Sequence, residues 1–197
     1  MANGYILAEY GKVKQTFPEF KQVLDSLRSN LIAKATADWA PLSYGGLAPR
    51  AGQFGVTTVM PQLFADITGT RLTTWKQTFN ATGAQTIMTG VNAGGIIPED
   101  YKIGLAGLAF LDKTLRVSEI KMQISDKKLP RMNIEEAMAY EKPMIVFEEG
   151  YILDEEAAFD LYAYVLTQGI QTVKLIGFQV NRVPNKLQVT NTGAAIT

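Results

Sequence analysis

The chain has 197 residues, of which 47% are hydrophobic and 19% are charged, and 19 basic side chains balance 19 acidic ones. It contains no cysteine and no histidine, which excludes disulfides, zinc–thiolate clusters, histidine metal sites, thiol nucleophiles and histidine bases. The zero net charge argues against a free-standing nucleic-acid-binding protein, because affinity for phosphates requires a basic excess on some face. The length suits one domain with an accessory segment.

The two halves of the chain differ mildly in charge. Residues 1–95 carry eight basic and five acidic side chains, whereas residues 96–197 carry eleven and fourteen. Such a polarity suits contacts between copies of one protein, and an ordinary solvated surface explains it equally.

No targeting or membrane segment is predicted. The first residues lack the basic region and the apolar stretch of a signal peptide. The longest charge-free stretch, Gln77 to Pro98, is rich in Thr, Asn, Gln and Gly and is too polar to cross a membrane. We therefore expect neither export nor a membrane-spanning segment.

One amphipathic helix is predicted near the N-terminus, from Thr16 to about Ala35. Thr16 is a capping residue, Pro18 suits the first turn and Glu19 completes a capping box. The apolar side chains of this segment recur at helical spacing and predict one buried stripe. That stripe comprises Phe17, Phe20, Val23, Leu24, Leu27, Leu31 and Ile32.

After Trp39 the composition changes. Residues 40–56 are rich in glycine and proline and predict an irregular connection. Ten of the eighteen threonines then lie between Thr57 and Thr89, which favours strands. Within 71–79 the alternation predicts a strand whose inner face carries Trp75 and Phe79.

The middle of the chain predicts two further strands. The apolar run 103–111 fits a strand covered on both faces, and a short buried helix is the alternative. The segment that follows the turn at Asp112 changes parity, so we expect a β-bulge near Ser118 and Glu119.

The C-terminal third predicts a short helix and three strands. The helix covers 134–140 and follows Asn133, and strand patterns lie in 144–147, 157–166 and 170–183. The last of these again changes parity around Gly177, where a second bulge is expected.

Together these elements predict a mainly β protein: one N-terminal helix followed by eight or nine strands. Short strands without regular helix alternation point to an antiparallel sandwich or barrel, and the eight-stranded jelly roll fits the length. We divide the chain into an N-terminal arm with the helix (1–40), a β-sandwich (41–183) and an extended tail (184–197). The polar segments 2–15 and 184–197 are predicted to be arms that pack on neighbouring copies.

Acidic side chains are the main candidates for chemistry. The acidic cluster in 148–156 is expected to flank a turn at Gly150 and Tyr151, and is the best place for a hard cation, although a solvated loop fits better. Glu119, Glu148 and Asp160 lie on strand-like segments and are the candidates for a glycosidase pair, but no spacing signature supports one. We therefore assign no catalytic, cofactor or metal residue.

Aromatic and glycine patterns favour structural roles. The aromatic residues scattered over the strands are predicted to pack in the core, and this role fits them better than an exposed sugar-binding platform. These are Trp39, Trp75, Phe79, Phe110, Phe147, Phe159 and Phe178. Gly94–Gly95 and Gly104–Gly107 do not open helices, so a phosphate-binding loop is not expected.

The order of elements resembles a viral capsid protein of the single jelly-roll type. An N-terminal arm and helix with a few basic residues (Lys12, Lys14, Lys21, Arg28) precede a threonine-rich β body and a polar tail. With Lys34, these residues make the N-terminal region the only locally basic stretch. The resemblance implies a structural subunit, not an enzyme, that assembles with copies of itself into a shell around a genome. It also implies a place in the virion, contacts with other capsid proteins and a weak nucleic-acid contact through the N-terminal region; outside the virion we expect a cytoplasmic protein.

Two other functions stay open. One is a carbohydrate-binding β-sandwich, which requires exposed aromatic rings. The other is a carboxylate-dependent hydrolase, which requires two acids in one cleft. A metal-dependent cupin is disfavoured because it requires histidine ligands.

Overall fold

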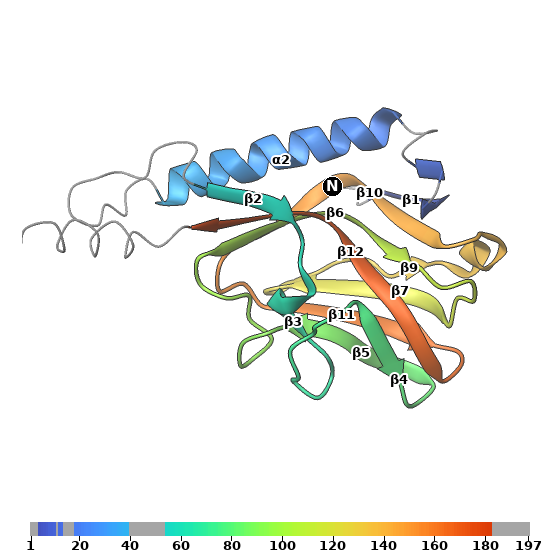
Figure 1. Cartoon of the computed structure of the whole chain (residues 1–197). Helices are drawn as coiled ribbons and strands as arrows, with labels where there is room; N and C mark the ends of the chain where they lie inside the picture. The colour runs from blue at the N-terminus through green and yellow to red at the C-terminus, as the bar shows by residue number, and fades with distance from the viewer. Residues whose placement is uncertain (1–3, 11, 14–17, 40–53, 183–197) are drawn as a thin grey trace, which may run out of the picture.

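A computed structural model describes residues 4–10, 12–13, 18–39 and 54–182 of the chain. Two antiparallel sheets pack face to face, and one long helix lies across the outside of one of them (Figure 1). The prediction of a mainly β sandwich with an N-terminal helix is confirmed. The tail 184–197 and most of the predicted connection 40–56 lie outside the described residues.

The sheet beneath the helix has the strand order β1-β10-β6-β12-β2, and β4 pairs with the other end of β12. Its strands are β1 (Tyr5–Glu9), β2 (Phe54–Thr58), β4 (Lys76–Phe79), β6 (Tyr101–Phe110), β10 (Pro143–Leu153) and β12 (Gly169–Arg182). Every residue of β6 after Tyr101 is buried, because the helix covers one face and the second sheet covers the other. The prediction of a strand covered on both faces is confirmed here.

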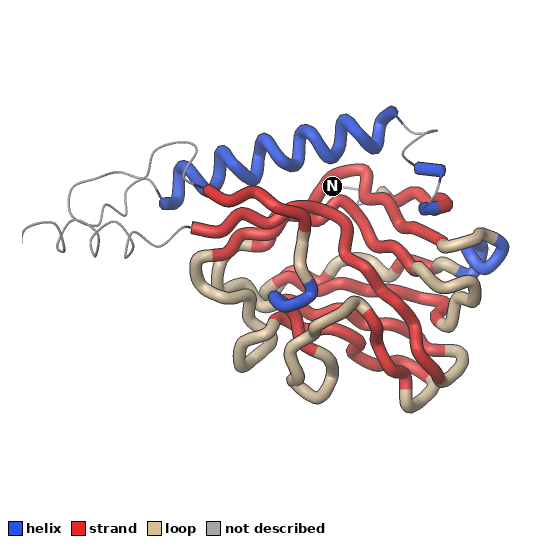
Figure 2. Tube along the Cα trace, in the orientation of Figure 1, coloured by secondary structure: helices blue, strands red, loops and turns tan. Residues whose placement is uncertain are grey.

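The second sheet has the order β3-β5-β11-β7-β8, with β9 also paired to β7. Its strands are β3 (Phe64–Ala65), β5 (Gly83–Gly90), β7 (Val117–Ile124), β8 (Lys127–Lys128), β9 (Met132–Asn133) and β11 (Phe159–Val165). It lies on the side of the molecule away from the helix, as the tube in Figure 2 shows. Two short 3-10 helices, η1 (Pro61–Leu63) and η2 (Glu135–Ala139), lie in its connections.

The main strands pair in a nested order. β2 and β4 share β12 as their partner, β5 pairs with β11, β6 with β10, and β7 with β8 and β9. β1, which pairs with β10, and β3, which pairs with β5, lie outside this nesting. When β2 and β4 are counted as one position and β8 and β9 as another, the outermost of the remaining strands pair with each other, and each inner pair follows the same rule.

The helix is α2 (Pro18–Trp39), whose buried side chains are Phe20, Leu27, Leu31, Ala35 and Trp39. Thr16 and Phe17 of the predicted cap and stripe lie outside the described residues. Val23, Leu24 and Ile32 are only half-buried, and the helix continues to Trp39, beyond the predicted end at Ala35. The reason is that Ala35 and Trp39 extend the buried stripe by two further steps of four residues.

Glycines on the sheet allow α2 to approach closely. A Cβ atom at Gly104 would lie 3.0 Å from Leu27, and one at Gly150 would lie 2.6 Å from it. The backbone of β6 and β10 therefore forms the surface against which Leu27 packs. This contact also corrects one prediction: Gly150 and Tyr151 lie inside β10 and form no turn, although the pairing with β6 shifts between Val146 and Tyr151.

Both predicted bulges are confirmed. In the pairing of β11 with β7 the register shifts so that Ser118 has no direct partner. The pairing of β12 with β6 shifts between Ile176 and Gly177, where Ala106 of β6 is the residue without a direct partner. Gly177 has a φ of 157°, and a Cβ atom there would lie 1.9 Å from the carbonyl oxygen of Gly104, so only glycine fits this bulge without displacing the backbone.

Other differences from the prediction are local. The predicted strand 71–79 is regular only over β4, although Gln77 and Phe79 are buried and Trp75 is half-buried, as expected for the inner face. The helix near 134–140 is the 3-10 helix η2, and the Asn133 side chain just before it accepts a hydrogen bond from the Glu135 amide at 2.9 Å.

The first residues differ most from the prediction. Within 2–15, expected to be an arm that packs on a neighbour, Tyr5–Glu9 forms β1 along β10 of the same chain, and Ala8 and Val13 are buried. Among the described residues, no helix combines the length and apolar character that crossing a membrane requires.

Candidate functional site: an ionic cluster and a tyrosine-lined depression

A buried lysine lies beneath the C-terminal end of α2. Lys102 of β6 is 2% exposed, and its ammonium lies 2.8 Å from Asp38 of the helix and 3.1 Å from Asp154 after β10. The same ammonium is 5.4 Å from the centre of the Trp39 ring, whose indole N–H donates to Glu155 at 3.1 Å. This arrangement joins the helix, β6 and the β10–β11 connection.

Lys34 adds a second cation to this ionic cluster. Its ammonium lies 3.1 Å from Asp38 and 3.2 Å from Asp154, so each carboxylate is shared by two lysines. Hydrogen bonds from Lys102 first and Lys34 second hold the pKa of Asp38 below its ordinary value, and the bond to Asp38 raises the pKa of Lys34. The last turn of α2 has no basic residue of its own, so Lys102 also supplies the positive charge that a helix C-terminus favours.

The ionic cluster decides what the acidic segment 148–156 can do. Asp154 and Glu155 are occupied by Lys102, Lys34 and Trp39, which makes them partners of the helix and not ligands of a cation. In the described part of the chain, no group of three or more acidic side chains is arranged to hold a metal ion.

The three candidate carboxylates do not converge. Glu148 lies on β10 in the sheet beneath the helix, whereas Glu119 and Asp160 lie on β7 and β11 of the other sheet. Asp160 pairs with Gln123, four residues along β7 from Glu119. Four residues of strand span about 13 Å, which exceeds the separation of roughly 5 to 10 Å in glycosidase pairs.

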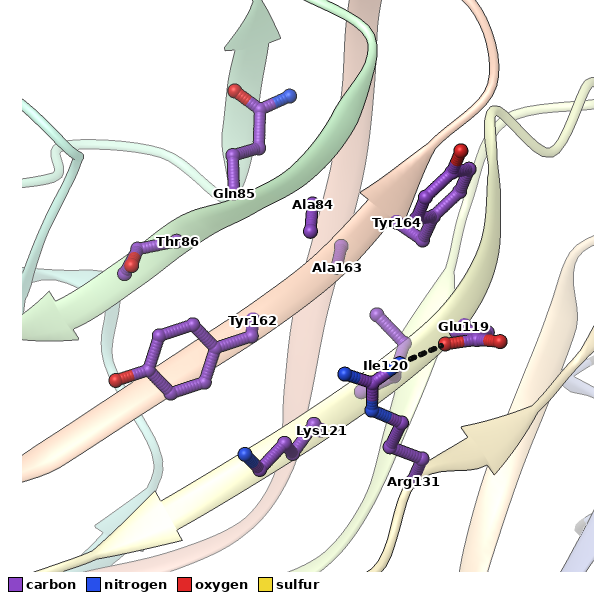
Figure 3. Close-up of a pocket in the computed structure, with 10 residues that line it drawn as sticks. All are labelled: Ala84, Gln85, Thr86, Glu119, Ile120, Lys121, Arg131, Tyr162, Ala163 and Tyr164. Atoms are coloured by element: carbon purple, nitrogen blue, oxygen red, sulfur yellow. Dashed lines mark hydrogen bonds and ion pairs between the residues drawn. The ribbon is translucent and has the colours of Figure 1, made fainter.

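The outer face of the second sheet carries a shallow depression of about 270 Å³ (Figure 3). Tyr162 and Tyr164 of β11 lie on either side of it, with Ala84 and Ala163 between them. Tyr164 is 46% exposed, and Tyr162 is half-buried. This tyrosine-lined depression is the clearest candidate for a binding site.

Charged side chains border the tyrosine-lined depression. Arg131 donates to Glu119 at 3.3 Å, and the Lys121 ammonium lies 5.6 Å from the centre of the Tyr162 ring. Burial, followed by the nearby charge of Asp160 and a hydrogen bond to it, raises the pKa of the Tyr162 hydroxyl. Tyr162 therefore stays a neutral phenol at physiological pH, with its hydroxyl directed to Asp160 at 3.4 Å.

The predicted aromatic core is largely confirmed. Five of the seven aromatic residues that the sequence assigns to packing are fully buried, and Trp75 and Phe178 are half-buried. The sequence analysis assigns no role to the two tyrosines that flank the depression. The sequence does contain a signal for their outward position, because Tyr162 and Tyr164 alternate along the strand with apolar residues that face the core. For the burial of Lys102 no sequence signal exists.

The remaining candidates keep structural roles. Gly94 and Gly95 have φ values of 80° and 71° in a tight turn, and Gly104 and Gly107 lie within β6, so neither pair opens a helix. Among the basic residues near the N-terminus, Lys12 pairs with Glu9 at 2.6 Å, Lys34 belongs to the ionic cluster, and Lys21 and Arg28 are exposed. Lys14 lies outside the described residues.

An apolar groove of about 240 Å³ lies between the N-terminal half of α2 and β12. Phe20 and Leu24 line it from the helix, and Ile176 and Phe178 line it from the strand. No strand of the described residues pairs with this edge of β12 between Thr172 and Phe178, because β2 pairs with residues from Phe178 onward and β4 with residues up to Thr172.

Comparison of the chain with protein-family models, with curated proteins and with solved structures finds no match.

Proposed function

We propose that this protein is a structural capsid subunit of the single jelly-roll type, which assembles with copies of itself into a viral shell around a genome. The nested pairing of its strands carries the proposal. Folding one long antiparallel hairpin into two sheets is how a jelly roll is built, and viral coats, lectins and cupins use this architecture. The absence of histidine from the sequence disfavours a metal-binding cupin.

Exposed apolar side chains give the assembly a contact surface. Leu166 and Ile170 are exposed by 40% and 58%, and they flank the turn between β11 and β12. Apolar side chains gathered on one part of a surface are typical of protein contacts. We define Leu166 and Ile170 as the tip of the sandwich and propose that it contacts a neighbouring subunit.

The assembly test uses the full chain. We expect light scattering after size exclusion to detect particles far heavier than the 21.6 kDa monomer, and electron microscopy to resolve closed shells. A chain that remains monomeric over a range of concentration, salt and pH would contradict the proposal.

A matched pair of variants tests the tip. Leu166→Asp together with Ile170→Asp is expected to abolish particles while leaving the circular dichroism and melting temperature of the subunit nearly unchanged. Met60→Asp is the control, because Met60 is 41% exposed but follows β2, away from the tip. Equal particle yields for the two proteins would show that the tip is not a contact.

A further inference from the structure

We propose that the tyrosine-lined depression on the β5–β11–β7 sheet binds a neutral sugar, such as the terminal unit of a glycan. This inference does not depend on the assembly proposal, because it rests on one face of a single subunit. It assigns a ligand class to Tyr162 and Tyr164 on β11 and to the charged side chains beside them.

The register explains why a depression forms between the two rings. Tyr164 pairs with Ala84 of β5, whose side chain ends at Cβ, and with Glu119 of β7. Ala163 lies between the tyrosines and turns its side chain into the core, so only the strand backbone and the small Ala84 side chain separate the two rings (Figure 3). The volume of about 270 Å³ is below the range of roughly 300 to 1,000 Å³ for drug-sized ligands, which suits one ring-sized ligand.

The tyrosines present the surfaces that sugars require. One face of a pyranose ring carries mainly C–H groups and packs against aromatic rings, while its hydroxyls require hydrogen-bond partners. Tyrosine offers a large rigid contact area at a low cost in conformational entropy. The Lys121 ammonium beside the Tyr162 ring, at 5.6 Å from its centre, and the Asp160 carboxylate near its hydroxyl help to hold that ring in place before a ligand arrives.

The polar groups around the depression favour a neutral ligand over an anion. Glu119 accepts hydrogen bonds, whereas Arg131 and Lys121 donate them. The hydroxyl groups of a sugar can therefore find a partner both as donors and as acceptors. With Asp160 behind Tyr162, two acidic side chains balance two basic ones. An anionic sugar or a phosphate would gain little from this balanced set, because it would meet as much repulsion as attraction.

Saturation-transfer NMR on the full chain provides the test. The probes are the methyl glycosides of glucose, galactose, mannose and N-acetylglucosamine, with methyl sialoside as the anionic comparison. We expect transfer to at least one neutral glycoside and weaker transfer to the sialoside. No transfer to any neutral glycoside, or preferential transfer to the sialoside, would overturn the proposal.

Variants connect the binding to the depression. Tyr164→Ala is expected to weaken binding at least about tenfold, the effect of losing one aromatic contact of about 1.4 kcal/mol. Tyr162→Phe keeps the ring and is expected to retain most of the affinity. Gln123→Ala, on the outer face of the same sheet but outside the depression, is the control and should bind as the parent does.

Particle formation is measured on the same variants, because Tyr164 lies near the tip. The expected result for Tyr164→Ala is lost sugar binding with particle yield retained. If the substitution instead lowers particle yield and the parent binds no glycoside, the depression is a contact between subunits and the sugar proposal is wrong. Sugar binding by a chain that forms no particles would leave this inference standing and contradict the assembly proposal alone.

Discussion

The ionic cluster beneath α2 predicts an asymmetry between removing its buried cation and removing the acids that pair with it. The Lys102 ammonium is sealed between Trp39 and the sheet, whereas Asp38 and Asp154 are each more than a third exposed. If both acids become amides, the buried charge keeps only Glu155, at 4.0 Å. If the lysine is removed, both acids keep Lys34 and water.

The magnitudes follow from this geometry. At 2.8 Å and an effective dielectric constant of about 20, the attraction between Lys102 and Asp38 is about 6 kcal/mol, offset by several kcal/mol of desolvation for the buried ion. Leaving a buried charge unpaired costs roughly 3 to 5 kcal/mol of unfolding free energy. Because Glu155 remains near Lys102, we expect the Asp38→Asn/Asp154→Asn variant to lose about 3 kcal/mol, near the lower end of that range. Lys102→Met keeps the volume of the side chain and is expected to cost about 1 kcal/mol or less.

Urea unfolding measures both effects. In a Trp75→Phe background the emission comes from Trp39 alone, since the chain has two tryptophans, and circular dichroism reports the sheets in parallel. We expect the triple variant, with Lys102→Met added to the two amides, to recover most of the stability that the amides lose. The reasoning is refuted if Lys102→Met costs as much as the two amides, or if the triple variant recovers nothing.

Three further predictions concern α2 and the sheet beneath it. Leu27→Ala should lower the unfolding free energy by about 2 to 4 kcal/mol in urea titrations, since it opens a cavity over the glycines of β6 and β10; an unchanged midpoint would show that the helix does not pack as described. Gly177→Ala should cost at least about 2 kcal/mol by the same measurement, because the new Cβ meets the Gly104 carbonyl, and a variant as stable as the parent would contradict this. Thermal melts against pH should show the full stabilisation from Asp38 above its ordinary pKa of 3.8 and its loss as the pH falls through the lowered value, whereas that from Lys34 is fully present below its ordinary pKa of 10.5 and is lost as the pH rises through the raised value. In Asp38→Asn the acid limb should shrink, and an acid limb of the same size in that variant would contradict the assignment.

The β-bulges show what the sequence could predict. A strand with one buried face must keep its parity, so the break in alternation near Ser118 required one extra residue in β7. The same reasoning identified β6 from its uninterrupted apolar run and β11 from its alternation. These signals are local, and a single segment contains all of the information.

Features that depend on distant residues could not be predicted in this way. Gly150 resembles a turn when it is read with its neighbours, and only the packing of Leu27 against it explains why a strand passes through. β1 is only five residues long and shows no alternation of apolar and polar side chains, so it is not recognised without β10 beside it. The burial of Lys102 depends on acids from the helix and from the β10–β11 connection, which lie far from it in sequence.

The helix covers one outer face of the sandwich and not the other, and the side chains on the two faces explain why. On the face of β6 and β10, Gly104 and Gly150 allow Leu27 to lie almost on the backbone, and the helix seals that face. On β11 the corresponding outward positions hold Tyr162 and Tyr164, whose rings would keep a helix away from the sheet. Only one sheet can therefore accept α2, and the position of the glycines determines which one. The other face keeps its aromatic rings in contact with solvent, which is the condition that the proposed sugar site requires.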